Sequence, residues 1–223
     1  MNRSALFLLA IAFVVATCDA VAGREADRLY EHAVRRHADS TPTERFSLYA
    51  RAAEEGHAVA QYNVAMMYAN GEAVNVDYQQ AVYWFRKSAD QRFAPAQLRL
   101  GELYYFGMGG LPVDRRHAAR LFEAAASQGD PDACLDLAIM LGSGDVLPLD
   151  PARARAMLDR AANGGNESAE EYREMLDAAP DGRFTAVAQD AFWRQQKQFW
   201  VDMAAQFGVR DAEEAVGGRK SER

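Results

Sequence analysis

The side chains that most often bind metals or act as nucleophiles are few and scattered in this chain. It contains four histidines and two cysteines. They are His32, His37, His57, His117, Cys18 and Cys134. No two histidines have the spacing that places two ligands on one helix face, and there is no CxxC pair. The sequence therefore predicts no metal site, no cofactor and no catalytic thiol, and we expect Cys134 to fill a small buried position in a helix.

Two further features could suggest chemistry, and neither has the residues that the chemistry needs. Gly107-Met-Gly-Gly110 is rich in glycine but lacks the Lys-Ser/Thr that completes a phosphate-binding loop, so we interpret it as a turn. There is no GxSxG motif. The acidic pairs Glu54-Glu55 and Glu213-Glu214 are expected on solvated helix ends or tails. The chain is therefore not expected to be an enzyme.

The strongest pattern is an internal repeat. Segments that begin at Ala60, Ala96 and Ala133 align with steps of 36 and 37 residues. Other columns keep this register, and they hold glycines (Gly71, Gly107, Gly144), aspartates (Asp77, Asp114, Asp150) and alanines (Ala53, Ala89, Ala126, Ala162). A fixed period of this length is typical of solenoids built from stacked helix pairs.

Each column has a physical role within a helix pair. Apolar residues such as Ala60, Val64 and Tyr68 recur at helical spacing and form the buried stripe of a first helix. The glycine column follows this stripe and is expected to stop the helix with positive φ. The aspartate column then caps a second helix. Only the first repeat has Arg92 where the second helix should end at glycine, so we expect a less regular turn there.

These columns resemble the Sel-one-like repeat, a relative of the tetratricopeptide repeat. The resemblance depends on Ala-Gln at 60–61 and 96–97, Leu-Gly at 100–101, Tyr104, the closing glycines, Asp77 with Ala81 and Trp84, and Ala-Ala at 52–53, 125–126 and 161–162. It covers about residues 45–170. The third unit departs from it, with Cys134 for glutamine and Leu141 for tyrosine. The resemblance implies an all-α, right-handed solenoid of antiparallel helix pairs that acts as a protein-binding adaptor.

The expected organisation follows from the repeat and its flanks. An N-terminal helix pair (23–57) contains a capping box from Thr41 to Glu44. Repeats 1, 2 and 3 occupy 58–93, 94–129 and 130–165. Residues 166–208 form C-terminal helices that we expect to cap the open end of the solenoid, and 209–223 form a disordered tail.

Residues 1–22 are typical of a cleaved secretory signal peptide. A positive Arg3 precedes a short apolar run, and Ala20-Val21-Ala22 offers a cleavage site. The run is too short to span a bilayer. A second interpretation remains open, because Val15-Ala16-Thr17-Cys18 resembles a degenerate lipobox in which Cys18 would be acylated. We therefore expect a periplasmic protein, with membrane attachment only if Cys18 is lipidated.

The formal net charge of −7 and the absence of a basic, aromatic patch argue against a nucleic-acid partner. Another protein is the expected partner. Two surfaces could bind it: the side of the solenoid lined by the first helices, and the tryptophans of the last helix. The candidate residues are Asn63, Met66, Arg99, Glu102, Asp136, Ile139, Trp193 and Trp200. We expect the tryptophans to lie beside an apolar stripe of the last helix. This stripe consists of Phe184, Val187, Ala191, Phe192, Phe199, Met203 and Phe207.

Three functions are compatible with this sequence. The first is an envelope interaction scaffold. The second is an immunity protein that neutralises a secreted phospholipase-type effector, as the family resemblance also allows. The third, a cell-wall hydrolase, is supported only by the expected location and the many carboxylates, without a nucleophile or metal cluster to perform hydrolysis.

Overall fold

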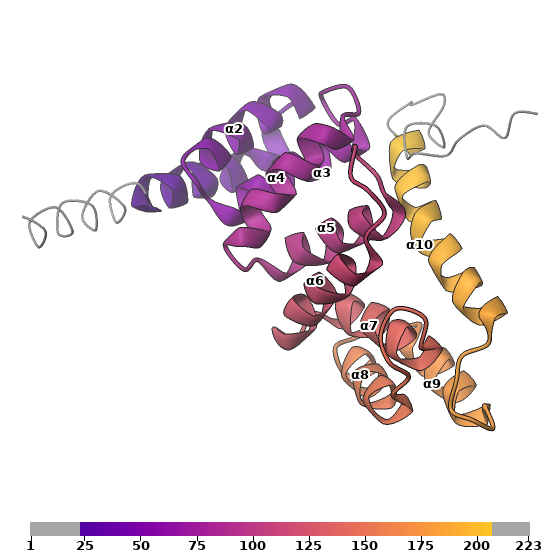
Figure 1. The fold of residues 1–223 in the computed structure, drawn as a ribbon. Helices are drawn as coiled ribbons and strands as arrows, with labels where there is room; N and C mark the ends of the chain where they lie inside the picture. Colours follow the sequence, from indigo (N-terminus) through magenta and orange to yellow (C-terminus); the bar gives the residue numbers. More distant parts are fainter. Residues whose placement is uncertain (1–22, 207–223) are drawn as a thin grey trace, which may run out of the picture.

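A computed structural model gives the fold, and it describes residues 23–206 (Figure 1). Residues 23–36 form an opening helix, followed by the short 3-10 helix η1 (His37–Asp39) and by α2 (Pro42–Glu54). Three helix pairs follow, and two further helices complete the described chain. The pairs are α3 (Ala58–Asn70) with α4 (Tyr78–Asp90), α5 (Ala94–Phe106) with α6 (Arg115–Ser127), and α7 (Pro131–Ser143) with α8 (Pro151–Asn163). The last helices are α9 (Ala169–Ala178) and α10 (Ala186–Gln206). Residues 23–206 contain no β-strand.

The helix pairs stack in sequence order, which confirms the predicted solenoid. Each first helix contacts its own partner, and each second helix contacts the first helix of the next pair, from α2 on α3 to α8 on α9. Small residues let the helices approach closely, because Ala60, Ala96 and Ala133 are completely buried. The surface formed by α3, α5 and α7 is called the helix-A face below.

Local signals in the sequence set the helix ends as expected. Gly71, Gly107 and Gly144 end the first helices with φ of 77°, 72° and 77°. In Gly107 the positive φ closes a bond from its N–H to the carbonyl of Leu103, which satisfies a terminal acceptor. The aspartate column also behaves as predicted, because the Asp114 carboxylate accepts the N–H of His117 at 2.9 Å. The capping box between Thr41 and Glu44 is confirmed.

The expectation of a less regular turn at Arg92 is wrong. Arg92 has φ of 65°, so it adopts the left-handed conformation that Gly129 adopts at the end of the second repeat, with φ of 92°. The same hydrogen bonds close both turns: Arg92 N–H to Ala89 carbonyl (2.8 Å) and Gly129 N–H to Ala126 carbonyl (3.0 Å). The repeat geometry is therefore preserved, and the arginine carries the strain.

Glutamines connect successive repeats by a ladder of side-chain hydrogen bonds. The Gln61 amide accepts from Gln91 at 2.7 Å, and the Gln97 amide accepts from Gln128 at the same distance. Each of Gln61 and Gln97 also donates to a carbonyl eight residues earlier in the chain. In the third repeat Cys134 stands in this column and is buried, as predicted. The ladder fixes the register between neighbouring pairs.

The C-terminal helices do not simply cap the end of the solenoid. α9 packs on α8, but α10 then turns back and contacts both α7 and α3. Figure 1 shows α10 running beside the stacked pairs rather than continuing the stack. The turn is fixed where the Phe184 N–H donates to the Gly142 carbonyl at 2.9 Å. α10 therefore bridges repeats that are not neighbours in sequence.

Candidate functional site: the groove between the helix-A face and α10

The tryptophans of α10 face the solenoid. Trp200 is completely buried, and Trp193 is 6% exposed. The Trp193 ring stacks on Tyr105 of α5 with centroids 3.8 Å apart, and Trp200 meets the edge of Phe85 at 6.3 Å. Burying each large aromatic side chain contributes about 1.5–3 kcal/mol. α10 is thus an integral part of the fold and not a loosely held segment.

The expected stripe on the last helix is only partly right. Phe184 and Phe192 are buried, but Val187 is 79% exposed and Ala191 is exposed. Trp193 and Trp200, which were expected beside the stripe, are buried, and Phe207 lies outside the described residues. Trp193 and Trp200 are seven residues apart, which is two helical turns, so they lie on one face. The large area of the indoles places that face against the solenoid.

Glu102 is the polar residue that joins α10 to the helix-A face. One carboxylate oxygen accepts from the Arg99 guanidinium at 2.7 Å, and the other accepts the Trp200 indole N–H at 2.8 Å. The Glu102 side chain is only 2% exposed. Burial raises the pKa of Glu102, and the positive charge of Arg99 opposes that rise. Because both oxygens are bonded, the buried carboxylate can be accommodated.

Asp136, on α7, is a second buried acid near this junction. Burial, and then the negative charge of Glu102, raise the pKa of Asp136 well above its usual value. Its Oδ2 atom is buried and has no hydrogen-bond partner among the described residues. The direction of this change follows from burial, because a neutral carboxylic acid is cheaper to bury than a carboxylate.

The structure buries most of the residues that the sequence suggested for partner binding. Glu102, Asp136, Ile139, Trp193 and Trp200 are buried, and Asn63, Met66 and Arg99 are half-buried. The expectation that the first helices present these side chains to solvent is therefore wrong for Glu102, Asp136 and Ile139. The physical reason is that α10 and the neighbouring helices cover them. The structure brings Arg99, Glu102 and Trp200 together, as the ion pair and indole bond described above.

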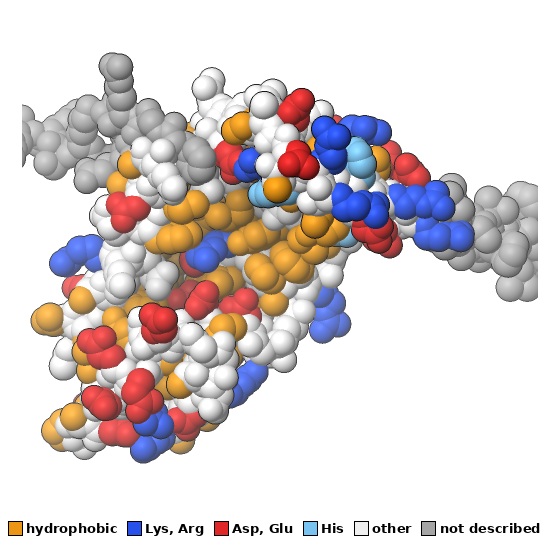
Figure 2. Space-filling view, turned by 180° about the vertical axis from the view of Figure 1, so that it is seen from behind, with side chains coloured by type: hydrophobic (Ala, Val, Ile, Leu, Met, Phe, Trp, Pro, Cys, Tyr) orange, Lys and Arg blue, Asp and Glu red, His pale blue; other side chains and the backbone are white. Residues whose placement is uncertain are grey.

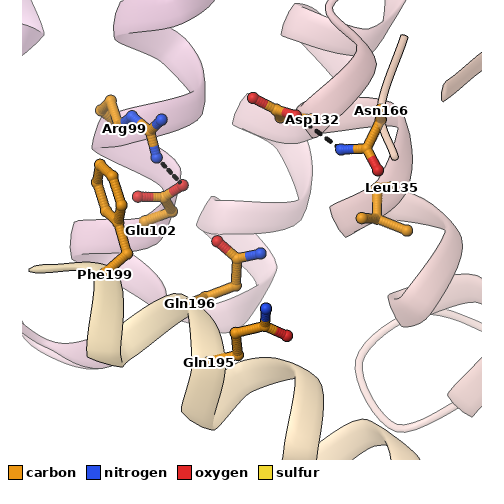
Figure 3. A pocket seen from close by; sticks show the side chains of 8 residues that line it. All are labelled: Arg99, Glu102, Asp132, Leu135, Asn166, Gln195, Gln196 and Phe199. Carbon is orange, nitrogen blue, oxygen red and sulfur yellow. Dashed lines mark hydrogen bonds and ion pairs between the residues drawn. The ribbon is translucent and has the colours of Figure 1, made fainter. Parts of the chain in front are cut away.

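What remains open is a pocket of about 280 Å³ between α10 and the helix-A face. α5 and α7 supply one side, α10 supplies the other, and the segment before α9 closes one end. The lining residues are Arg99, Glu102, Asp132, Leu135, Asn166, Gln195, Gln196 and Phe199. Figure 3 shows the side chains of α10 pointing toward those of α5 and α7. This pocket and its lining residues are called the α10 groove below.

One face of the molecule is hollowed and has mixed character. Figure 2 shows apolar side chains gathered across the hollow centre of the face, with acidic side chains along its lower part. Within the groove, Leu135 and Phe199 are apolar and the other lining residues are polar or charged. Such a mixture suits a polar chain with apolar side groups better than a purely apolar ligand.

Sequence reasoning found Arg99 and Glu102 but missed the other lining residues. Asp132 and Leu135 are in the first turns of α7, and Asn166 lies outside the helices. A signal for the α10 side did exist, because five polar residues (194–198), Gln195 and Gln196 among them, separate Trp193 from Phe199-Trp200. A polar run between two buried tryptophans indicates positions that the core does not use.

A second hollow, of about 370 Å³, lies at the N-terminal end. It is lined by His32, Arg36, Ser40, Glu44, Ser47 and Leu48. Its lining side chains are mostly exposed, and the Glu44 carboxylate is already bonded to Thr41 in the capping box. The α10 groove is the better-built site, since its charged groups are held in place by bonds.

Within residues 23–206, no group of three or more His, Cys, Asp or Glu side chains is arranged to hold a metal ion. The same part of the chain has no helix with the length and apolarity needed to cross a bilayer. Cys18 and the expected signal peptide lie outside the described residues, as does the expected tail 209–223.

Comparison with known proteins identifies relatives that are described as regulators. The chain is 29% identical over 154 residues to an exopolysaccharide production negative regulator of Rhizobium leguminosarum bv. viciae, which covers 63% of this chain and 58% of the relative. It is 28% identical over 152 residues to chitin synthase regulatory factor 3 of Schizosaccharomyces pombe. That match covers 67% of this chain but 16% of the relative. The chain thus spans only part of the length of these relatives.

A solved structure and a repeat family agree with the fold. The crystal structure of a Sel1 repeat protein from Oxalobacter formigenes superposes with a TM-score of 0.59 at 26% identity, covering 78% of this chain and 68% of that one. The Sel1 repeat itself matches residues 46–57, 58–93, 94–130 and 131–166. These four matches cover more than half of the sequence. The first lies mostly in α2, and the other three coincide with the three helix pairs. The chain belongs to the Sel1 repeat family.

Proposed function

We propose that this protein is a non-enzymatic adaptor that binds another protein through the α10 groove. Sel1 repeats imply a protein-interaction scaffold, and the similar regulators from Rhizobium and Schizosaccharomyces fit a role in controlling other proteins. The observation that carries the proposal is the groove itself. It places bonded charges and unbonded carboxamides around an open space, although α10 covers the rest of the nearby helix-A face.

The groove is suited to hold part of a partner and not the whole contact. Its volume is slightly below the range of about 300–1,000 Å³ that is usual for small-ligand pockets. A stable protein complex buries about 800 Å² on each partner. We therefore expect one anchoring segment of the partner in the groove, with the remaining contact on the rims formed by α10 and the first turns of α5 and α7.

Affinity capture with matched variants tests this function. The protein from residue 23 onward is immobilised and exposed to a native envelope extract, beside the variant Gln196→Arg, which fills the groove with a long cationic side chain. Tyr83→Ala serves as the control, because Tyr83 is 47% exposed on α4 and outside the groove. We expect a partner that is captured by the parent and the control but lost by Gln196→Arg. Equal capture by all three proteins would show that the partner binds outside the α10 groove.

We also propose that the protein is exported to the periplasm. The support is the pattern of residues 1–22, with a positive start, a short apolar run and a small-x-small site at Ala20 to Ala22. N-terminal sequencing of the mature protein tests it, and we expect a start near Gly23. A start at Cys18, with detergent needed for extraction and with Cys18→Ala turning the product soluble, would instead establish the lipoprotein form.

A further inference from the structure

We propose that the α10 groove recognises an extended peptide segment that presents a basic side chain, lysine or arginine, to Asp132. This inference rests on the proposed function and adds the chemistry of the partner. It depends on three features of the groove, each judged within residues 23–206. They are a carboxylate that no cation neutralises, two carboxamides without a hydrogen-bond partner, and an aromatic ring with one face already occupied.

The first feature is the charge balance of the lining. Arg99 is the only cationic side chain among the lining residues, and its guanidinium is paired with Glu102 at 2.7 Å. Asp132 is exposed and accepts one hydrogen bond, from the Asn166 amide at 2.7 Å. No ion pair to Asp132 forms within residues 23–206. The lining therefore carries one uncompensated negative charge, which favours a cationic group.

The electrostatic effect of Asp132 on its neighbours also favours a cationic group in the groove. The charges of Asp132 and Asp130 both raise the pKa of the buried Asp136, and Asp132 also raises that of Glu102, although burial is the largest cause in each case. These buried acids therefore experience a negative potential from the exposed side of α7. A cation bound at Asp132 would make that potential less negative.

The second feature is the pair of carboxamides on α10. Neither Gln195 nor Gln196 forms a side-chain hydrogen bond with any residue of the described chain, and Figure 3 shows both side chains pointing toward the groove. A carboxamide has an N–H donor and a carbonyl acceptor, as a peptide group has. Two adjacent carboxamides can thus bond the main chain of an extended segment without selecting its side chains.

The third feature distinguishes a peptide from a glycan. Sugar rings commonly pack on an exposed aromatic face, but the Arg99 guanidinium lies over the Phe199 ring at 4.7 Å from its centroid. Phe199 also meets Trp200 edge to face at 5.7 Å. Arg99 therefore occupies one face of the ring, and an aliphatic side chain of a peptide can still contact the edge of the ring.

Short peptides and NMR spectroscopy of the intact protein provide the test. The probes are acetylated and amidated pentapeptides that differ at one residue, Ac-Ala-Leu-Lys-Leu-Ala-NH₂ and Ac-Ala-Leu-Glu-Leu-Ala-NH₂. The side-chain amide signals of Gln195 and Gln196 report binding at the groove. We expect the lysine peptide to bind with Kd on the order of 1 mM, at least about tenfold more tightly than the glutamate peptide, as one charge-assisted hydrogen bond allows.

Variants separate the charge from the main-chain contacts. Asp132→Asn is expected to remove the preference for lysine, and Asp132→Lys to reverse it in favour of glutamate. Gln196→Ala should weaken both peptides by a similar factor. Gln198→Ala is the matched control on the same helix, because Gln198 bonds Asp202 and does not line the groove. Unchanged helical circular dichroism and melting confirm that each variant is folded.

Several results would overturn the inference. It fails if neither peptide shifts the amide signals at millimolar concentration, or if both bind equally. Binding of tetra-N-acetylchitotetraose in place of the peptides would make the groove a glycan site. If a partner is captured by the parent and lost by Gln196→Arg, but the peptides do not bind, the adaptor function is supported and only the basic segment is refuted. If the lysine peptide binds but no captured protein depends on the groove, the basic-segment preference is supported and the adaptor function is refuted.

Discussion

Trp200 donates its indole N–H to Glu102 at 2.8 Å, across 98 residues of sequence. The bond connects the last described helix to the middle of the second repeat, and Glu102 simultaneously holds Arg99. One carboxylate thereby fixes both the position of α10 and a wall of the α10 groove. Its removal should affect stability and binding together.

Glu102→Ala should lower the free energy of unfolding by about 3–5 kcal/mol, because it leaves the buried Trp200 N–H without its acceptor and the half-buried Arg99 without its partner. Glu102→Gln, which keeps one acceptor, should cost less. Urea unfolding followed by tryptophan fluorescence measures both. Glu123→Ala is the control, since its pair with Arg153 is long (3.4 Å) and exposed and should contribute less than about 1 kcal/mol. Similar losses for Glu102→Ala and Glu123→Ala would show that Glu102 does not hold α10.

Asp136→Asn should stabilise the protein increasingly as the pH rises. Burial raises the folded-state pKa of Asp136 above its usual 3.8, so its favourable contribution is complete below the unfolded pKa and is lost as pH rises toward the folded pKa. Between the unfolded and the folded pKa of Asp136, the free energy of unfolding of the variant should rise by about 1.4 kcal/mol per pH unit relative to that of the parent.

Urea unfolding of the Asp136→Asn variant and the parent at several pH values from 4 to 8, chosen around the usual pKa of 3.8, tests this difference. Asp90→Asn, at an exposed position of α4, is the matched control for the change of residue type. Parallel curves for Asp136→Asn and the parent would mean that Asp136 is ionised in the folded state.

Arg92→Gly should raise the free energy of unfolding by about 1 kcal/mol, since a left-handed conformation costs about 1–2 kcal/mol for a residue with a Cβ atom and glycine offsets part of this through greater freedom in the unfolded chain. The reverse change at the matching position, Gly129→Arg, should lower it by a similar amount, because an added Cβ there meets no atom within 4 Å and only the backbone is strained. Thermal unfolding of the two variants checks the pair. Changes of the same sign would exclude backbone strain as the cause.

Cys134 should be unreactive toward a thiol reagent in the folded protein and fully reactive in urea. It is 1% exposed, and burial raises the pKa of its thiol, so little thiolate is available. Absorbance after addition of a disulfide reagent gives the number of reactive thiols, with the protein from residue 23 onward used so that Cys134 is the one cysteine present. Rapid labelling without urea would indicate that α7 opens locally.

The sequence predicted features that are determined within a few residues. The stop at Gly107, the cap at Asp114 and the box from Thr41 to Glu44 each depend on the local backbone, so a residue type at the right spacing was sufficient. Arg92 shows the limit of this reasoning, because the stacking of repeats imposed a glycine-like φ on an arginine.

The site could not be predicted in the same way. The repeat period describes contacts between neighbouring helix pairs, whereas the position of α10 depends on contacts such as that between Trp200 and Glu102, which have no period. The apolar residues of α10 fit more than one face of a helix, and only the partner surface selects among them. For this reason the open groove, and the role of Asp132, Gln195 and Gln196, emerge only in three dimensions.

The return of α10 to α3 changes the kind of folding transition that this repeat protein should have. In an open solenoid each unit contacts only its neighbours, so the ends can unravel independently and units can be added or removed. Here α10 contacts α3 and α7, which belong to the first and third repeats. These contacts join residues that are far apart in the sequence, so the stability of each repeat no longer depends on its neighbours alone. Unfolding of any one repeat would also disrupt the contacts of α10 with α3 and α7. The array should therefore unfold in one cooperative step, and insertion of an extra 36-residue unit would separate the two ends that α10 must reach.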